Sequence, residues 1–184
     1  MSLPPDADAP LETMWEGRFI RAQRRGRWEF VGRARGIRAA VILAEQDGRV
    51  ILVEQYRVPL GRRCIELPAG LIGDEQHGEA VMTAAARELE EETGYRAGRL
   101  ELVGEFFSSP GMISESFTLV RAFDLKKVGP GGGVEGEGIM VHEVPRKEIT
   151  AFLAERRAAG IAVDVRLLAL LDPLSSPRLD PSRG

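Results

Sequence analysis

The chain has 184 residues, of which 43% are hydrophobic and 29% are charged, and this balance suits one compact domain with a sizeable core. Its formal net charge of −3 gives no reason to expect nucleic acid or an acidic membrane surface as a partner. The single cysteine, Cys64, cannot form an internal disulfide, and no apolar run is long enough for a signal sequence or a membrane span. We therefore expect a cytoplasmic protein.

The two ends of the chain differ in composition from the middle. The opening stretch MSLPPDADAP and the closing stretch PLSSPRLDPSRG are rich in Pro, Ser and Asp and poor in large apolar residues. Segments of this kind bury too little apolar surface to become ordered. We predict flexible tails over residues 1–14 and 173–184 and a single domain over residues 15–172.

The first half of this domain is predicted to be mainly β-structure. Residues 15–31 carry apolar side chains at strand-like intervals around a basic RRGR turn, which predicts a hairpin. The β-branched runs at 39–43 and 50–55 are joined through Asp47-Gly48, a favourable hairpin turn, and together they indicate the centre of a sheet. Strong helix formers then run from about Glu79 to Thr93, and Gly94 stands where helices commonly end.

The second half mixes strands with helices. Strands are predicted at 99–107 and 116–123, and the Gly-rich stretch GPGGGVEGEG leads into a last strand, IMVHEV. Two helices, over residues 146–159 and 163–171, are predicted to finish the fold. This mixture implies α+β or α/β packing in layers.

The segment from Arg87 to Gly94 holds four glutamates in five positions. On a helix, at about 100° per residue, Glu88, Glu91 and Glu92 fall within an arc of roughly 100°, whereas Glu90 points elsewhere. A solvated acidic face is the simplest interpretation. It explains this pattern poorly, because Glu88 and Glu92 are like charges at i,i+4 and because anions are disfavoured at a helix C-terminus. A hard divalent cation such as Mg²⁺, which takes carboxylate and phosphate oxygens as ligands, fits better.

The spacing of Gly73, Glu79 and the run from Arg87 to Tyr95 resembles the Nudix box, GX5EX7REUXEEXGU. Tyr95 departs mildly from this pattern, since an aliphatic residue is usual there. The resemblance implies the Nudix fold, an α/β/α sandwich of the α+β class, here with an N-terminal hairpin or strand extension. It also implies metal-dependent hydrolysis of a nucleoside diphosphate linked to another moiety. The place of Glu79 is open between a catalytic and a capping role.

The same resemblance assigns roles to residues of the box. It implies that Glu88, Glu91 and Glu92 are ligands of Mg²⁺, for which Mn²⁺ can substitute. Arg87 would hold the glutamates in place by ion pairing, and Arg87 and Glu91 thereby count among the catalytic residues.

Upstream of the box, QYRVPLGRRCIELPAGLI resembles the corresponding stretch of ADP-ribose and ADP-sugar pyrophosphatases. By that match the backbone oxygen of Ala69 is a metal ligand, Arg57 binds substrate phosphate and Glu66 supports the site. An ordinary surface role for Arg57 stays open. Downstream, Pro110 in SSPG resembles a proline that marks the ADP-ribose subgroup and that would contact substrate, although Pro-Gly is also a common turn.

Three further matches belong to the same subgroup. Glu137 in EGEGIMVHEVP aligns with a loop glutamate that serves as general base, and Glu135 is the alternative. The subgroup forms homodimers whose N-terminal strands reach the partner, and Trp28 corresponds to an aromatic residue that stacks on the adenine. Trp28 could instead belong to a hydrophobic core. The stretch VDVR at 163–166 resembles a late motif of an ADP-sugar pyrophosphatase.

We therefore predict Mg²⁺-dependent hydrolysis of ADP-ribose, and of related ADP-sugars, to AMP and a sugar phosphate. Two alternatives stay open. The substrate could be another nucleoside diphosphate derivative, such as GDP-mannose, NADH or a coenzyme A derivative, because generic metal ligands do not select a base or sugar. The domain could also sense ADP-ribose without cleaving it. We interpret His77 and His142 as structural or surface residues and Cys64 as a small buried residue.

Overall fold

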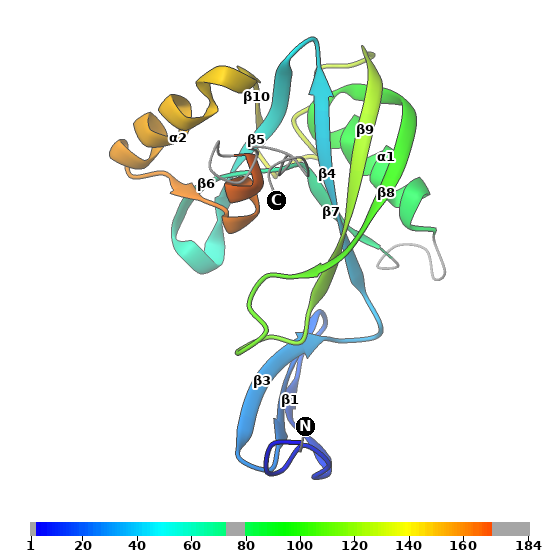
Figure 1. Ribbon diagram of the computed structural model, residues 1–184, viewed down its shortest axis with the longest axis vertical. Helices are drawn as coiled ribbons and strands as arrows, with labels where there is room; N and C mark the ends of the chain where they lie inside the picture. Colours follow the sequence, from blue (N-terminus) through cyan, green and yellow to red (C-terminus); the bar gives the residue numbers. More distant parts are fainter. Residues whose placement is uncertain (1–2, 73–79, 171–184) are drawn as a thin grey trace, which may run out of the picture.

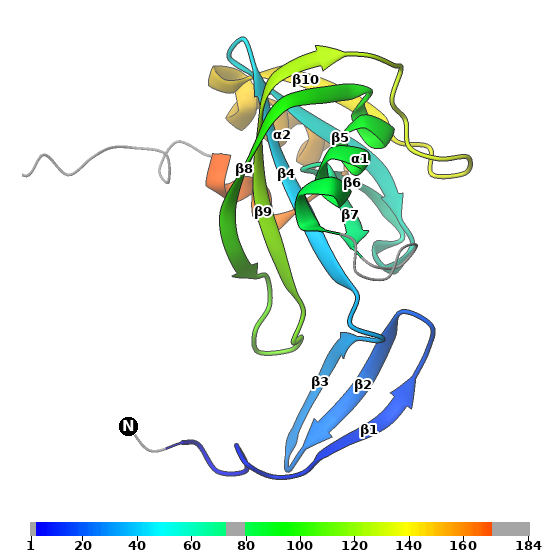
Figure 2. The ribbon, with the colours of Figure 1, turned by 90° about the vertical axis from the view of Figure 1, so that its right-hand side faces the viewer.

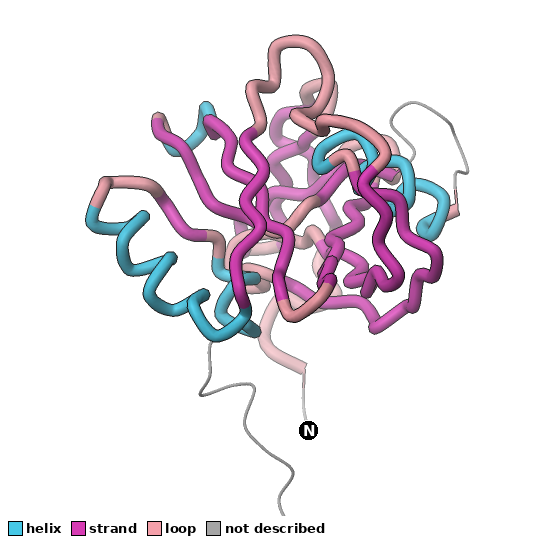
Figure 3. The backbone as a smooth tube through the Cα atoms, turned by 90° about the horizontal axis from the view of Figure 1, so that it is seen from above, coloured by secondary structure: helices cyan, strands magenta, loops and turns pink. Residues whose placement is uncertain are grey.

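A mixed β-sheet lies between helices in the computed structural model, which describes residues 3–72 and 80–170 (Figures 1 and 3). Its strands run in the order β11-β6-β5-β4-β9-β8, with β10 paired to β5 and β7 paired to β4. The strands of this sheet are β4 (Arg38–Gln46), β5 (Arg49–Arg57), β6 (Arg62–Glu66), β7 (Ala69–Ile72), β8 (Tyr95–Phe107), β9 (Ser116–Lys127), β10 (Met140–Pro145) and β11 (Ala162–Val163). The helices are α1 (Val81–Thr93), α2 (Ile149–Ala158) and the 3₁₀ turns η1 (Val58–Leu60), η2 (Arg146–Glu148) and η3 (Val165–Leu170).

The two faces of the sheet form two separate cores because successive side chains of a strand point to opposite sides. On β4, Ile42 packs in the core under α1, and its neighbour Val41 packs in the core under α2. On β5, Ile51 packs in the core under α1 and Leu52 packs in the core under α2. The central strands are therefore apolar on both faces, and the predicted α/β/α sandwich of the α+β class is confirmed.

Two turn predictions are also confirmed. Asp47 and Gly48 both have positive φ, 52° and 71°, which suits the two-residue turn between β4 and β5. Gly94 ends α1 in the left-handed conformation, and its N–H donates to the carbonyl of Glu90 at 2.8 Å. The helix thus ends where its glutamate cluster ends.

A smaller sheet of β1 (Leu11–Glu16), β2 (Ile20–Arg25) and β3 (Trp28–Arg33) projects from the main body (Figure 2). The predicted hairpin corresponds to β2 and β3, and β1 adds a third strand. Because β1 pairs with β2 from Leu11 onward, residues 11–14 belong to this sheet and not to the expected N-terminal tail. Val31 bonds to Met112 and Ser114 at 3.0 and 2.9 Å, which joins this sheet to the loop between β8 and β9.

The end of the chain differs from the prediction. The helix expected over 163–171 is instead the short strand β11 followed by the 3₁₀ turn η3. The cause is a parallel pairing of β11 with Cys64 and Ile65 of β6, which the N–H of Asp164 extends by bonding to the carbonyl of Ile65 at 3.0 Å. The predicted tail over 173–184 lies outside the described residues. No helix in the described part of the chain has the length and apolar character needed to cross a membrane.

Candidate active site

Helix α1 carries the glutamate cluster and packs on the sheet through its apolar face. Its fully buried apolar residues are Ala84, Ala85 and Leu89. Glu92 points inward in the last turn and is only 6% exposed. Glu90 turns away from the cluster and forms two hydrogen bonds of 2.8 Å with Arg96. Glu92 is therefore directed toward the sheet, whereas Glu90 points away from it and Glu91 is exposed.

Two of the glutamates lie against the backbone of β7. The N–H of Ala69 donates to the carboxylate of Glu92 at 3.0 Å. A Cβ atom added to Gly70 would lie 1.8 Å from Cδ of Glu88, so only glycine leaves room for that side chain. The structure thus brings together the helix and the strand that the sequence assigned to one metal site.

Arg87 lies between two glutamates of the cluster. Its guanidinium is 3.0 Å from a carboxylate oxygen of Glu88 and donates to Glu91 at 3.0 Å. These contacts restrain both carboxylates near the helix end. Gly73 and Glu79, the other marked positions of the box, lie outside the described residues.

The Gly-rich loop, residues 129–138, caps the C-terminal end of α1. The N–H groups of Gly132 and Gly133 donate to the carbonyls of Glu92 and Glu91 at 2.8 and 3.0 Å. These carbonyls have no partner within the helix, so the loop satisfies them. Gly131 approaches so closely that a Cβ atom there would lie 2.4 Å from the carbonyl carbon of Thr93. The loop is therefore anchored to the helix that carries the cluster.

This anchoring brings Glu137 to the cluster. The Glu137 carboxylate accepts a hydrogen bond from the N–H of Val134 at 2.9 Å, and its charge acts on Glu92. Glu135 lies on the same loop and is exposed. Glu137 is exposed as well, and of the two predicted candidates for the general base it is the one whose charge acts on Glu92.

Negative charge accumulates around Glu92. Burial raises the pKa of this carboxyl to about 8, and the charges of Glu88 and Glu137 act in the same direction, against the Ala69 hydrogen bond and the charge of Arg57. Outside residues 73–79 and the undescribed ends, no three acidic, histidine or cysteine side chains are already arranged to hold a metal ion. The carboxylates of Glu88, Glu91 and Glu92 nevertheless suit a hard divalent cation, which takes oxygen ligands, and Arg87 already pairs with two of them.

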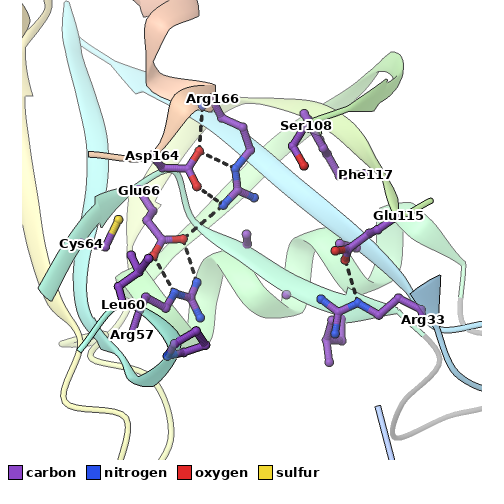
Figure 4. A pocket seen from close by; sticks show the side chains of 15 residues that line it. Arg33, Arg57, Leu60, Cys64, Glu66, Ser108, Glu115, Phe117, Asp164 and Arg166 are labelled. Carbon is purple, nitrogen blue, oxygen red and sulfur yellow. Dashed lines mark hydrogen bonds and ion pairs between the residues drawn. The ribbon is translucent and has the colours of Figure 1, made fainter. Parts of the chain in front are cut away.

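A cavity of about 480 Å³ opens beside this cluster, and the backbone of Ala69 and Gly70 forms part of its wall. A network of charged side chains lines one side of this cavity (Figure 4). Glu66, which is 2% exposed, accepts hydrogen bonds from both ends of the Arg57 guanidinium at 2.6 and 2.7 Å. Arg57 thus faces the cavity in a fixed orientation.

Arg166 continues this network from the C-terminal part of the chain. It donates to Glu66 at 3.2 Å and to Asp164 at 2.7 and 2.6 Å. Burial alone would raise the pKa of Asp164, but the Arg166 side chain and backbone N–H hold that pKa below its usual value. The VDVR stretch that holds both residues resembles a late motif of an ADP-sugar pyrophosphatase, but no site role was predicted for either residue.

A second ion pair forms the opposite wall of the cavity. Nε of Arg33, at the end of β3, donates to Glu115 at 2.7 Å (Figure 4). Ser108 and Phe117 lie near it on the cavity wall. Sequence reasoning missed these four residues because nothing in their local pattern distinguishes them from surface or core positions.

Two predicted substrate-binding residues lie outside this cavity. Trp28 is 52% exposed on the projecting sheet, where its Nε1–H group is 3.4 Å from the carbonyl of Pro5. Pro110 is exposed in the loop between β8 and β9. Within one chain, neither residue lines the cavity that Arg57 and Glu66 form.

Cys64 and His142 occupy structural positions. Cys64 is 3% exposed, and burial raises the pKa of its thiol to about 12, so it stays protonated. His142 lies 3.0 Å from the buried carboxylate of Glu54 and belongs to no part of the cavity. His77 lies outside the described residues.

Comparison with known proteins agrees with this geometry. The NUDIX domain family model matches residues 34–161, which span most of the chain. The chain belongs to the Nudix hydrolase family. This Nudix hydrolase is 32% identical over 142 residues to the ADP-ribose pyrophosphatase of Bacillus subtilis, covering 76% of this chain and 75% of the relative. It is 35% identical over 150 residues to the GDP-mannose pyrophosphatase of Cronobacter sakazakii, covering 76% and 74%.

Two further matches bear on the length and the fold of this Nudix hydrolase. It is 36% identical over 119 residues to the methanol dehydrogenase activator of Bacillus methanolicus and covers 63% of that protein. A crystal structure described as an ADP compounds hydrolase matches with a TM-score of 0.66 and 24% identity, covering 88% of this chain and 89% of the other. This second match shows the Nudix fold.

Proposed function

We propose that this Nudix hydrolase cleaves the pyrophosphate bond of ADP-ribose and of related ADP-sugars, in a Mg²⁺-dependent reaction that gives AMP and a sugar phosphate. One observation carries the proposal. The glutamate cluster of α1 lies against the Ala69 backbone beside an arginine-bearing cavity of about 480 Å³, and the charge of Glu137 acts on Glu92. That arrangement suits an anionic substrate whose diphosphate lies between the glutamates and Arg57.

The proposed metal site consists of Glu88, Glu91, Glu92 and the carbonyl of Ala69, with Mn²⁺ as a substitute for Mg²⁺. A bound divalent cation would neutralise the diphosphate and acidify a water molecule. Arg87 positions two of these carboxylates through its ion pairs.

The other residues act on the substrate and on water. Arg57, oriented by Glu66, binds a phosphate oxygen through the part of its guanidinium that faces the cavity. Glu137 accepts a proton from the attacking water as its oxygen bonds to phosphorus. The bond between that phosphorus and the bridging oxygen breaks, and the bridging oxygen leaves with the other phosphate.

We also propose a homodimer in which the projecting sheet contacts the partner. Several large apolar side chains of this sheet and of its β1–β2 turn are exposed, which is typical of an interaction surface. They are Leu11, Met14, Trp15, Phe19, Ile20 and Trp28. In such a dimer Trp28 stacks on the adenine held by the partner, and Pro110 contacts substrate near the interface. This arrangement accounts for their position outside the cavity of their own chain.

Substitution of the two loop glutamates tests the assignment of the base. Glu137→Gln should lower kcat for AMP release from ADP-ribose by about 100-fold and change KM little, because a base acts in the chemical step. Glu135→Gln, on the same loop, is the matched control and should retain kcat. Loss of kcat in Glu135→Gln alone would transfer the role to Glu135. If wild type binds ADP-ribose but releases no AMP, the domain is a sensor.

A further inference from the structure

The Gly-rich loop is held at its C-terminal end as well as at its contact with α1. The carbonyl of Gly138 accepts a hydrogen bond of 3.1 Å from Nη2 of Arg63 on β6. Gly138 directly follows Glu137, and Ile139 then bonds through its N–H to the carbonyl of Gly132 at 3.3 Å. The contact with Arg63 therefore acts at the residue next to the proposed base.

Arg63 is itself held by a buried carboxylate. Its Nε donates to Glu54 at 2.6 Å, and its Nη2 donates to the backbone carbonyl of Glu54 at 2.9 Å. Glu54 is 1% exposed, and an ionised carboxylate in such a place needs charged or polar partners. A single planar guanidinium thus joins β5 to the end of the Gly-rich loop in a fixed geometry.

The other oxygen of Glu54 strengthens this arrangement. It lies 3.0 Å from Nε2 of His142 on β10 and 4.0 Å from Nη1 of Arg156 on α2. In addition, β10 begins with Met140 paired to Glu54 in the sheet. Side chains from β6, β10 and α2 therefore converge on one carboxylate, which leaves Arg63 little freedom to move.

We propose that Arg63 is a positioning residue that holds Glu137 in register with the glutamate cluster of α1. This inference rests on the proposed function, in which Glu137 receives the proton of the attacking water. Arg63 does not line the cavity that contains Arg57, so it acts on the reaction through the loop and not through substrate contact. Its loss should lower kcat and leave KM nearly unchanged.

Arg63→Lys is the most informative variant. Lysine keeps a positive charge beside Glu54, so the fold should be retained, but its ammonium cannot reproduce the planar contacts with Glu54 and Gly138. We expect kcat for ADP-ribose to fall by about 10- to 100-fold, as is common when a group that orients catalytic residues is changed. Arg62→Lys, at the exposed neighbouring position, is the matched control and should keep both kcat and KM. A wild-type kcat in Arg63→Lys would overturn the proposal.

Combination with Glu137→Gln separates positioning from a general structural effect. If Arg63 acts through Glu137, adding Arg63→Lys to Glu137→Gln should reduce kcat no further. Full additivity of the two effects would contradict the inference, because it would show that Arg63 acts elsewhere.

Amide hydrogen exchange gives a readout that does not depend on activity. The N–H of Ile139 should exchange faster in Arg63→Lys than in wild type, at a matched melting temperature, because the C-terminal end of the loop is released. Unchanged exchange would overturn the positional inference. Absence of AMP release from wild type with accelerated exchange in the variant would instead reject the hydrolytic function and with it the role of Glu137, while retaining the contact.

Discussion

The N–H of Ala69 donates a hydrogen bond of 3.0 Å to Glu92 and so ties strand β7 to the last turn of α1. The bond fixes the separation of two elements that supply oxygen ligands to the proposed metal site. Because Glu92 is 6% exposed and lies near Glu88 and Glu137, its negative charge is costly until a cation is bound.

The stability of the metal-free protein should therefore fall as the pH rises. Burial raises the pKa of Glu92 to about 8 in the folded state, from an ordinary value of 4.5. The folded state then binds the proton more tightly than the unfolded chain. The resulting stabilisation is complete below pH 4.5 and is lost as the pH rises through about 8. The loss should be on the order of 4 kcal/mol in urea denaturation with EDTA.

Two glutamine variants serve as comparison for that experiment. Glu92→Gln cannot ionise but can still accept the hydrogen bond from Ala69, so its stability should lack this pH dependence. Glu135→Gln removes an exposed carboxylate, and this variant should keep the pH dependence of stability seen in wild type. A wild-type pH dependence in Glu92→Gln would show that another group is responsible.

Gly70→Ala should displace Glu88 from the site. The new Cβ atom would lie 1.8 Å from Cδ of Glu88, so the carboxylate must move. We expect at least about a tenfold loss of AMP release, together with a higher Mg²⁺ requirement, because a ligand is misplaced. Gly129→Ala is the matched control, since a Cβ atom there meets nothing within 4 Å. Normal Mg²⁺ dependence in Gly70→Ala would remove Glu88 from the proposed ligand set.

Arg57→Lys should raise KM for ADP-ribose by about tenfold, because lysine keeps the charge but loses the two-pronged contact with Glu66 that orients it. Arg96→Lys tests whether the loss of any two-pronged Arg–Glu contact raises the KM for ADP-ribose. Arg96 makes the same type of contact with Glu90, with two bonds of 2.8 Å, but on an exposed surface away from the cavity. Steady-state kinetics with ADP-ribose give the KM of each variant for comparison. Equal changes in KM would contradict a phosphate role for Arg57.

Gly94 and Gly48 share one backbone conformation, but only Gly48 has room for a side chain. Gly94→Ala and Gly48→Ala therefore separate the cost of the conformation from the cost of a steric clash. Their φ angles are 72° and 71°. A Cβ atom at Gly94 would lie 2.1 Å from the carbonyl oxygen of Gly129, whereas at Gly48 it meets nothing within 4 Å. Gly48→Ala should cost about 1 kcal/mol and Gly94→Ala about 3 kcal/mol in thermal unfolding. Equal costs would mean that the Gly-rich loop does not pack tightly on α1.

Much of the fold could be predicted because its signals are local. Asp47-Gly48 predicts the hairpin, and Gly94 predicts the end of α1, since each needs only the conformation of one turn. Strand β11 could not be predicted, because it has two residues and forms only through pairing with β6. Tyr95 appeared as a mild departure from the box, and the structure shows that its hydroxyl donates to Glu143 at 2.6 Å.

The candidate site also has one part that local sequence predicts and another part that it does not. The cluster on α1 could be recognised from spacing alone, since its residues are neighbours on one helix. The cavity is assembled from distant residues, as in the contact between Arg166 and Glu66, which are 100 positions apart, and that between Arg33 and Glu115, which are 82 apart. Charge pairs of this kind leave no local pattern, because each partner is determined by the packing of the whole sheet.

The most direct test of the proposed function is the release of a nucleoside monophosphate, AMP or GMP, from a panel of nucleotides with Mg²⁺, for wild type and for Glu92→Gln. The panel contains ADP-ribose, ADP-glucose, GDP-mannose and NADH. We expect rapid release of AMP and ribose phosphate from ADP-ribose, and a loss of at least about 100-fold in Glu92→Gln. Preferred cleavage of GDP-mannose, or hydrolysis of ADP-ribose that persists in Glu92→Gln, would contradict the account.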